Sequence, residues 1–214
     1  MARTPLSKIA PTAFHSGIKR GLRAPRRPPL GRQAWLDAAR QALIEDGTAG
    51  VEVMKLARRL KSTNRGGFYW FFKNREQLLE ELLAYWAETS TIQFDRILTE
   101  SGDDGMKAYH ALINLWIDES SYDPRWDGAV RDWARTSAAV LRTVESVDRQ
   151  RIKSIERIFQ NLGYRGNAAH IRARVTYYHQ VGYYALGVRE SKTQRRRLLT
   201  YYREVLTGLP EPER

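Results

Sequence analysis

The chain contains no cysteine, so it can form neither disulfides nor thiolate metal sites. It also has no apolar run close to the roughly 20 residues that a membrane-spanning helix needs. These absences exclude a disulfide scaffold, cysteine chemistry and a helical membrane protein. A protein without cysteine fits a reducing compartment, so we expect a cytoplasmic location.

Acidic residues are missing from the N-terminal segment, because the first carboxylate in the chain is Asp37. The overall net charge is +12, and beyond this segment basic residues only slightly outnumber the 24 acidic ones. A basic arm on a nearly balanced body predicts a polyanionic partner, either nucleic acid or an acidic membrane surface. The proline-rich stretch 25–29 cannot lie inside a helix, so residues 1–30 are predicted to be a disordered arm. The positively charged residues before Asp37 are Arg3, Lys8, Lys19, Arg20, Arg23, Arg26, Arg27 and Arg32.

Helical periodicity covers almost all of the chain after residue 33. A first apolar stripe runs from Trp35 to Leu43, and Gly47 ends it. Asn74 with Gln77 three residues later has the spacing of a capping box. No alternating β pattern and no internal repeat is present, so the predicted fold class is all-α. Further helices are predicted near 53–60, 65–71, 74–99, 106–121, 125–136, 138–162, 167–188 and 193–208.

The segment 53–79 has the most specific pattern in the chain. Its core reads Leu56-Ala57-Arg58-Arg59-Leu60 and, after a short turn, Arg65-Gly66-Gly67-Phe68-Tyr69-Trp70-Phe71-Phe72-Lys73-Asn74-Arg75-Glu76-Gln77-Leu78. Residues 33–86 resemble the helix-turn-helix of TetR-family transcriptional regulators. The resemblance implies a three-helix DNA-binding head at residues 31–76 and a helical ligand-binding and dimerisation bundle at 77–214.

The predicted DNA contacts lie on and around the second helix of this motif. Arg65 stands at the start of the recognition helix, where an arginine can pair with both acceptors of a guanine. The resemblance places Tyr69 and Arg75 on phosphates, and Phe68 in the core of the head. Phe71 departs from the family, which usually has histidine there. The predicted DNA-binding set is Lys55, Thr63, Asn64, Arg65, Gly67, Tyr69, Trp70, Lys73 and Arg75.

Aromatic side chains are dense after Tyr109. In a helical bundle they can line an apolar cavity with a few polar groups, which is typical of a small-molecule site. Core packing is the alternative for each of them. The predicted ligand-binding residues are His110, Trp116, Trp133 and Tyr177. The family resemblance further implies that the last two long helices dimerise, and their stripes contain the small residues Gly182 and Ala185.

Together these patterns predict a sequence-specific DNA-binding regulator, a repressor that a small molecule releases from a palindromic DNA operator. A homodimer can present two reading heads to successive major grooves. Activation instead of repression is also compatible with the motif. No membrane partner is expected. The alternative is a helical protein-interaction module without sequence-specific DNA binding. The sequence lacks the HExxH, phosphate-loop and Gly-x-Ser-x-Gly motifs, so neither an enzyme nor any cofactor or metal is expected.

Overall fold

The computed structural model describes residues 31–61 and 66–209, and every regular element in these ranges is a helix. The predicted all-α class is therefore confirmed. The basic arm of residues 1–30 lies outside the described residues, as do three predicted DNA contacts, Thr63, Asn64 and Arg65. No helix in the described ranges has both the length and the hydropathy to cross a membrane.

The helices begin and end close to their predicted positions. One element was not predicted, a short 3-10 turn after the first helix. In chain order the elements are α1 Arg32–Asp46, η1 Gly47–Gly50, α2 Val53–Arg59, α3 Gly66–Tyr69, α4 Arg75–Ser101, α5 Gly105–Asp118, α6 Pro124–Ala134, α7 Ala138–Asn161, α8 Gly166–Ala185 and α9 Lys192–Thr207.

Local side-chain chemistry explains several of these boundaries. Asn74 caps α4, because its side-chain oxygen accepts a hydrogen bond from the Gln77 amide at 2.8 Å. The Lys73 amide donates to the Gln77 side-chain oxygen at 2.7 Å. The reciprocal bond of the predicted capping box therefore forms at Lys73, one residue before Asn74. Gly47 follows α1 with φ of 64°, a backbone region that favours glycine.

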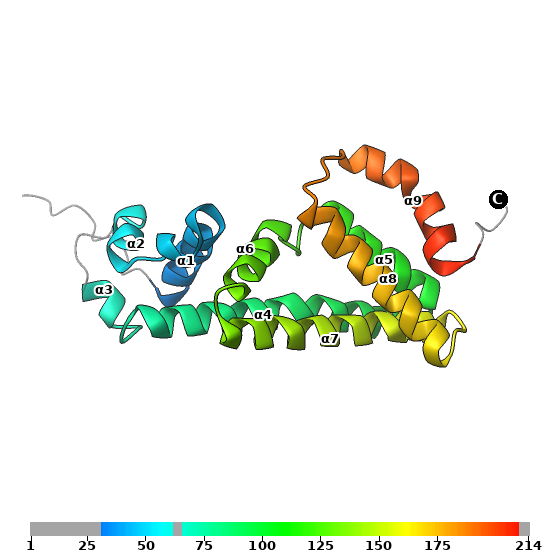
Figure 1. Ribbon diagram of the computed structural model, residues 1–214, viewed down its shortest axis with the longest axis horizontal. Coiled ribbons are helices and arrows are strands. Elements are labelled where there is room, and N and C mark those ends of the chain that lie inside the picture. Colours follow the sequence, from blue (N-terminus) through cyan, green and yellow to red (C-terminus); the bar gives the residue numbers. More distant parts are fainter. Residues whose placement is uncertain (1–30, 62–65, 210–214) are drawn as a thin grey trace, which may run out of the picture.

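The head and the body share one long helix (Figure 1). Helices α1 to α3 gather at one end, and α4 runs from them along the body beside α7. Helices α5 and α8 cross the far half of this pair, α6 connects the body to α1, and α9 packs on α5 and α8. A first core joins the head to α6 and the start of α7, and a second fills the body between α4, α5, α7 and α8.

Candidate nucleic-acid interface and ligand cavities

Buried phenylalanines attach α3 to the head. Phe68 and Phe72 are almost fully buried and stack on each other with ring centroids 5.3 Å apart. Phe68 also meets Trp35 of α1 edge to face at 5.4 Å. Both phenylalanines therefore lie in the core, and Phe71 packs against it as well. These contacts fix which face of α3 points outward.

The outward face of α3 exposes large aromatic side chains. Trp70 is 86% exposed and Tyr69 is 58% exposed, although both are residues that proteins usually bury in part. Neighbouring Gly67 adds no side-chain bulk, and Lys73 is exposed just beyond. Four predicted DNA contacts therefore lie close together in the chain, on and just after α3, at exposed or partly exposed positions. We call them the α3 surface: Gly67, Tyr69, Trp70 and Lys73. On such a surface, the lysine and the tyrosine can contact phosphates, and the aromatic rings can contact a groove of the DNA.

Two further predicted contacts, Lys55 and Arg75, have partners within the head. Lys55 on α2 pairs with Glu52, with 3.1 Å between Nζ and Oε1. The Arg75 guanidinium donates to the carbonyl oxygens of Val51 at 2.6 Å and Thr48 at 2.5 Å. The half-buried Arg75 side chain therefore holds the η1 turn against α4, and its contact with a phosphate stays a prediction.

A network of buried charges occupies the centre of the body. The Arg131 guanidinium donates to both carboxylate oxygens of Asp148, at 2.9 and 2.7 Å, and to Asp127 at 2.9 Å. Arg151, which is 1% exposed, approaches Asp127 with 2.9 Å between Nη1 and Oδ1. The Tyr177 hydroxyl donates to Asp148 at 2.6 Å and accepts from both arginines. We call these five residues the ion network, and they connect α6, α7 and α8.

The ion network is held in its charged form. Burial alone would raise the pKa of Asp127, but the Arg151 and Arg131 guanidinium groups lower it below its usual range. Burial raises the pKa of Tyr177, so its hydroxyl keeps its proton and can donate. Because positive and negative groups are matched here, the network is a structural element that fills the middle of the bundle.

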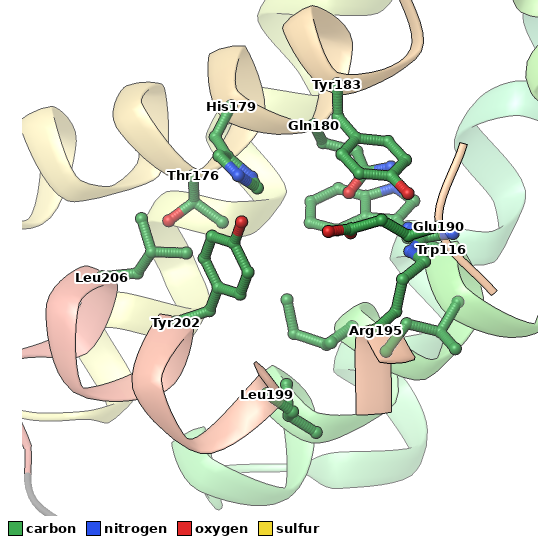
Figure 2. A pocket seen from close by; sticks show the side chains of 12 residues that line it. Trp116, Thr176, His179, Gln180, Tyr183, Glu190, Arg195, Leu199, Tyr202 and Leu206 are labelled. Atoms are coloured by element: carbon green, nitrogen blue, oxygen red, sulfur yellow. The ribbon is translucent and has the colours of Figure 1, made fainter. Parts of the chain in front are cut away.

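A cavity of about 50 Å³ lies under α9, between this helix, α5 and α8 (Figure 2). Its apolar wall consists of Ile113, Trp116, Ile117, Leu199 and Leu206. Polar side chains complete it, namely Thr176, His179, Gln180, Tyr183 and Tyr202, with Glu190 and Arg195 beside them. We call this space the α9 cavity.

The four predicted ligand-binding residues do not lie together. Trp116 lines the α9 cavity. His110 is exposed on α5, Trp133 packs half-buried on the core of the head, and Tyr177 belongs to the ion network. Of the four, only Trp116 lines the α9 cavity, so a role in ligand binding stays a prediction for the other three. Thr176 and Gln180, two polar residues at buried positions of α8, also line the α9 cavity and were not among the predicted ligand-binding residues.

A larger, open groove of about 540 Å³ lies where the head meets the body. Arg40 of α1 contributes to it and donates to Asp123 at 2.5 Å, with its guanidinium carbon 4.3 Å from the Trp126 ring centroid. Asp123 also caps α6. One arginine thus ties the first helix of the head to the start of α6, so the groove lies beside the connection through which the two parts can influence each other.

Comparison with known proteins gives the following findings. Residues 36–82 match the family described as bacterial regulatory proteins, tetR family. The fold is similar to that of SmeT in its complex with triclosan, with a TM-score of 0.62 and 19% identity over 86% of this chain and 97% of that one. It is likewise similar to SmeT described as the repressor of the Stenotrophomonas maltophilia multidrug efflux pump SmeDEF, with a TM-score of 0.56 and 20% identity over 86% and 98%. No curated protein matches the chain.

Proposed function

We propose that this chain, which belongs to the tetR family of bacterial regulatory proteins, is a repressor that binds operator DNA through its head and responds to a small molecule in its body. The single observation that carries the proposal is the α3 surface. It is aromatic, uncovered and held in place by a buried phenylalanine pair, within the segment that matches the family. We expect such a protein to have no catalytic role and, because its partner is DNA, to act in the cytoplasm.

The response to a small molecule has separate support. A fold shared with SmeT, one structure of which holds triclosan, favours a ligand site in the helical body. This body contains both the α9 cavity and the open groove beside Arg40. A ligand can shift the protein away from DNA only if it binds the released state more tightly than the DNA-bound state.

Exposed apolar residues on α8, just after its end and on α9 support a homodimer on palindromic DNA. Val175 and Tyr178 are about half exposed, and Leu186 and Val205 are more than four-fifths exposed. A chain without a partner exposes such surface at the risk of aggregation, whereas a second copy would bury it. Substituting Val205→Glu is expected to shift the protein from dimer to monomer in analytical ultracentrifugation. A dimer of unchanged stability would refute this interface.

DNA recognition is tested by selecting bound duplexes from a random pool and then measuring variants on the selected site. Trp70→Ala and Tyr69→Ala are each expected to weaken binding by about tenfold or more, since contacts at a groove contribute roughly 1–3 kcal/mol. Lys73→Ala is expected to lower the salt dependence by about 0.9 in log–log slope, because one phosphate contact is lost.

The matched control for the lysine is Arg142→Ala, which removes one exposed positive charge from α7 in the body. It is expected to leave the salt slope unchanged. If no sequence is enriched from the pool, or if Trp70→Ala and Tyr69→Ala bind like the parent chain, the chain does not read DNA through the α3 surface. The interaction-module alternative would then be the better account.

A further inference from the structure

Two polar side chains in the α9 cavity lack partners. Thr176 is 1% exposed and Gln180 is 6% exposed, and both line the cavity. Within residues 31–61 and 66–209, neither the Thr176 hydroxyl oxygen nor the Gln180 amide nitrogen has a hydrogen-bond partner. Buried polar groups in folded proteins are nearly always satisfied, so each unsatisfied one calls for an explanation. Their common position in a cavity points to a bound molecule.

The basic groups around the cavity are either paired or uncharged. Arg195 pairs with Glu119 at 3.2 Å and its guanidinium carbon lies 4.6 Å from the Tyr183 ring centroid. Partial burial and the nearby Arg195 charge lower the pKa of His179, so its imidazole is neutral at pH 7. Arg195 is thus occupied, the imidazole is uncharged, and the Glu190 carboxylate also lies at the wall, so nothing there favours an anionic ligand.

The apolar part of the wall favours a flat ring. Trp116 and the aliphatic side chains of α5 form one side, and Tyr202 of α9 stands opposite Thr176 and His179 (Figure 2). The cavity of about 50 Å³ is smaller than the roughly 150 Å³ that holds benzene in an engineered protein. A ring therefore enters only if α9 moves outward. Because α9 also carries the proposed dimer surface at Val205, such a ligand would act on the dimer.

We propose that the α9 cavity binds a small neutral aromatic molecule that carries an amide, carbonyl or hydroxyl group, which the Thr176 hydroxyl and the Gln180 amide recognise. The proposal rests on the proposed ligand-responsive function and names the ligand class and its site. The ring packs against Trp116, and the polar group satisfies the two orphaned side chains. Binding displaces α9, which links occupancy to the geometry of the dimer.

The test uses benzamide and benzoate, two probes of nearly the same shape of which only benzoate is charged. Binding to the full chain is measured by ligand-observed NMR titration. Benzamide is expected to bind saturably in the millimolar range, and benzoate at least tenfold more weakly. Equal or tighter binding of benzoate would overturn the neutral ligand class, and the absence of saturable benzamide binding would overturn the site.

Substitutions of the cavity residues test whether benzamide binds in the α9 cavity. The double substitution Thr176→Val with Gln180→Leu keeps the side-chain shapes and removes the polar groups, so it is expected to weaken benzamide binding at least tenfold. The matched control is Thr89→Val with Gln93→Leu, which makes the same changes in the groove beside Arg40 and is expected to bind benzamide like the parent chain. Equal loss in both variants, or loss in neither, would contradict the assignment.

Two more measurements separate this proposal from its alternatives. Thr176→Val alone, without probe, is expected to unfold at the same or a higher temperature than the parent chain, because it removes an unsatisfied hydroxyl. A clear drop would mean that this hydroxyl is already satisfied and would overturn the proposal. DNA binding by the double variant reports on the proposed function separately. If it binds the selected duplex normally but benzamide never binds the parent chain, only the ligand proposal fails.

Discussion

Helix α8 carries two kinds of buried polar residue one position apart. Tyr177 points into the ion network, where its hydroxyl has three partners on α6 and α7. Thr176 and Gln180 point into the α9 cavity, where their orphaned atoms have no partner within the described part of the chain. Burial of a polar group therefore does not by itself identify a binding site. A satisfied group holds the fold together, whereas an unsatisfied group next to a space is available to a ligand.

Removing one charge from the ion network is expected to destabilise the fold strongly. Asp127→Ala leaves the buried Arg151 without its carboxylate, so the free energy of unfolding is expected to fall by about 3–5 kcal/mol. Urea denaturation at a fixed protein concentration measures it, since a dimer makes stability depend on concentration.

The control for this substitution is Asp132→Ala on the same helix. Asp132 pairs with Arg135 at 3.5 Å, and both side chains are largely exposed. Exposed pairs contribute at most about 1 kcal/mol, so a much smaller change is expected. Similar losses in the two variants would show that the ion network contributes no more than a surface pair.

Substitutions at two neighbouring residues test whether the hydroxyl groups on the two sides of α8 differ in their contribution to stability. Tyr177→Phe removes a hydroxyl that is bonded to charged groups and is expected to lower the free energy of unfolding by about 1–3 kcal/mol. Thr176→Val removes an unsatisfied hydroxyl in a similar volume, and the free energy is expected to stay unchanged or rise by up to about 1 kcal/mol. Thermal and urea unfolding measure both. The same sign and size of effect in the two variants would remove the distinction between the two sides of α8.

The sequence was informative about the head because the motif there specifies both the spacing and the direction of its side chains. The alternation of Phe68 and Phe72 with Tyr69 and Trp70 separates a core face from an exposed face, and the structure confirms it. The predicted contact of Arg75 with phosphate stays a prediction, because a guanidinium at the start of a helix can bind phosphate or nearby carbonyl oxygens, and here it binds two carbonyl oxygens. Only the position of the η1 turn, which was not predicted, decides between them.

The cavity in the body could not be predicted in the same way, because α8 has apolar or small residues around its whole circumference. One stripe, with Ile171, Val175 and Tyr178, proves to be exposed on the proposed dimer surface. The buried stripe starts at Ala169 and Ala173 and continues with Thr176, Tyr177 and Gln180. Polar residues at helical spacing within a buried stripe were the available signal. The predicted ligand-binding residues were instead chosen from the many aromatic residues in this region. The density of aromatic residues does not show which way each side chain points.

The smallest expected effect concerns pH, which should distinguish the two sides of α8. The pKa of His179 is lowered in the folded chain, mainly by partial burial, so the unfolded chain binds its proton more readily. This contribution to stability is complete above the unfolded pKa of about 6.5 and is lost as pH falls through the folded value. The pKa of Asp127 is also lowered, so the stability from the ion network is complete above about pH 4 and is lost only under stronger acid.

Mild acidification from pH 7 to pH 5 is therefore expected to lower the unfolding temperature slightly through His179 and to leave the ion network intact. His179→Phe keeps a ring next to Tyr202, 4.9 Å away between centroids in the parent chain, and removes the titration. Its unfolding temperature should change less than that of the parent chain over this pH range, as measured by circular dichroism. If the parent and the variant lose stability equally between pH 7 and pH 5, groups elsewhere cause the loss. The α9 cavity would then be as insensitive to mild acid as the network on the other side of the same helix.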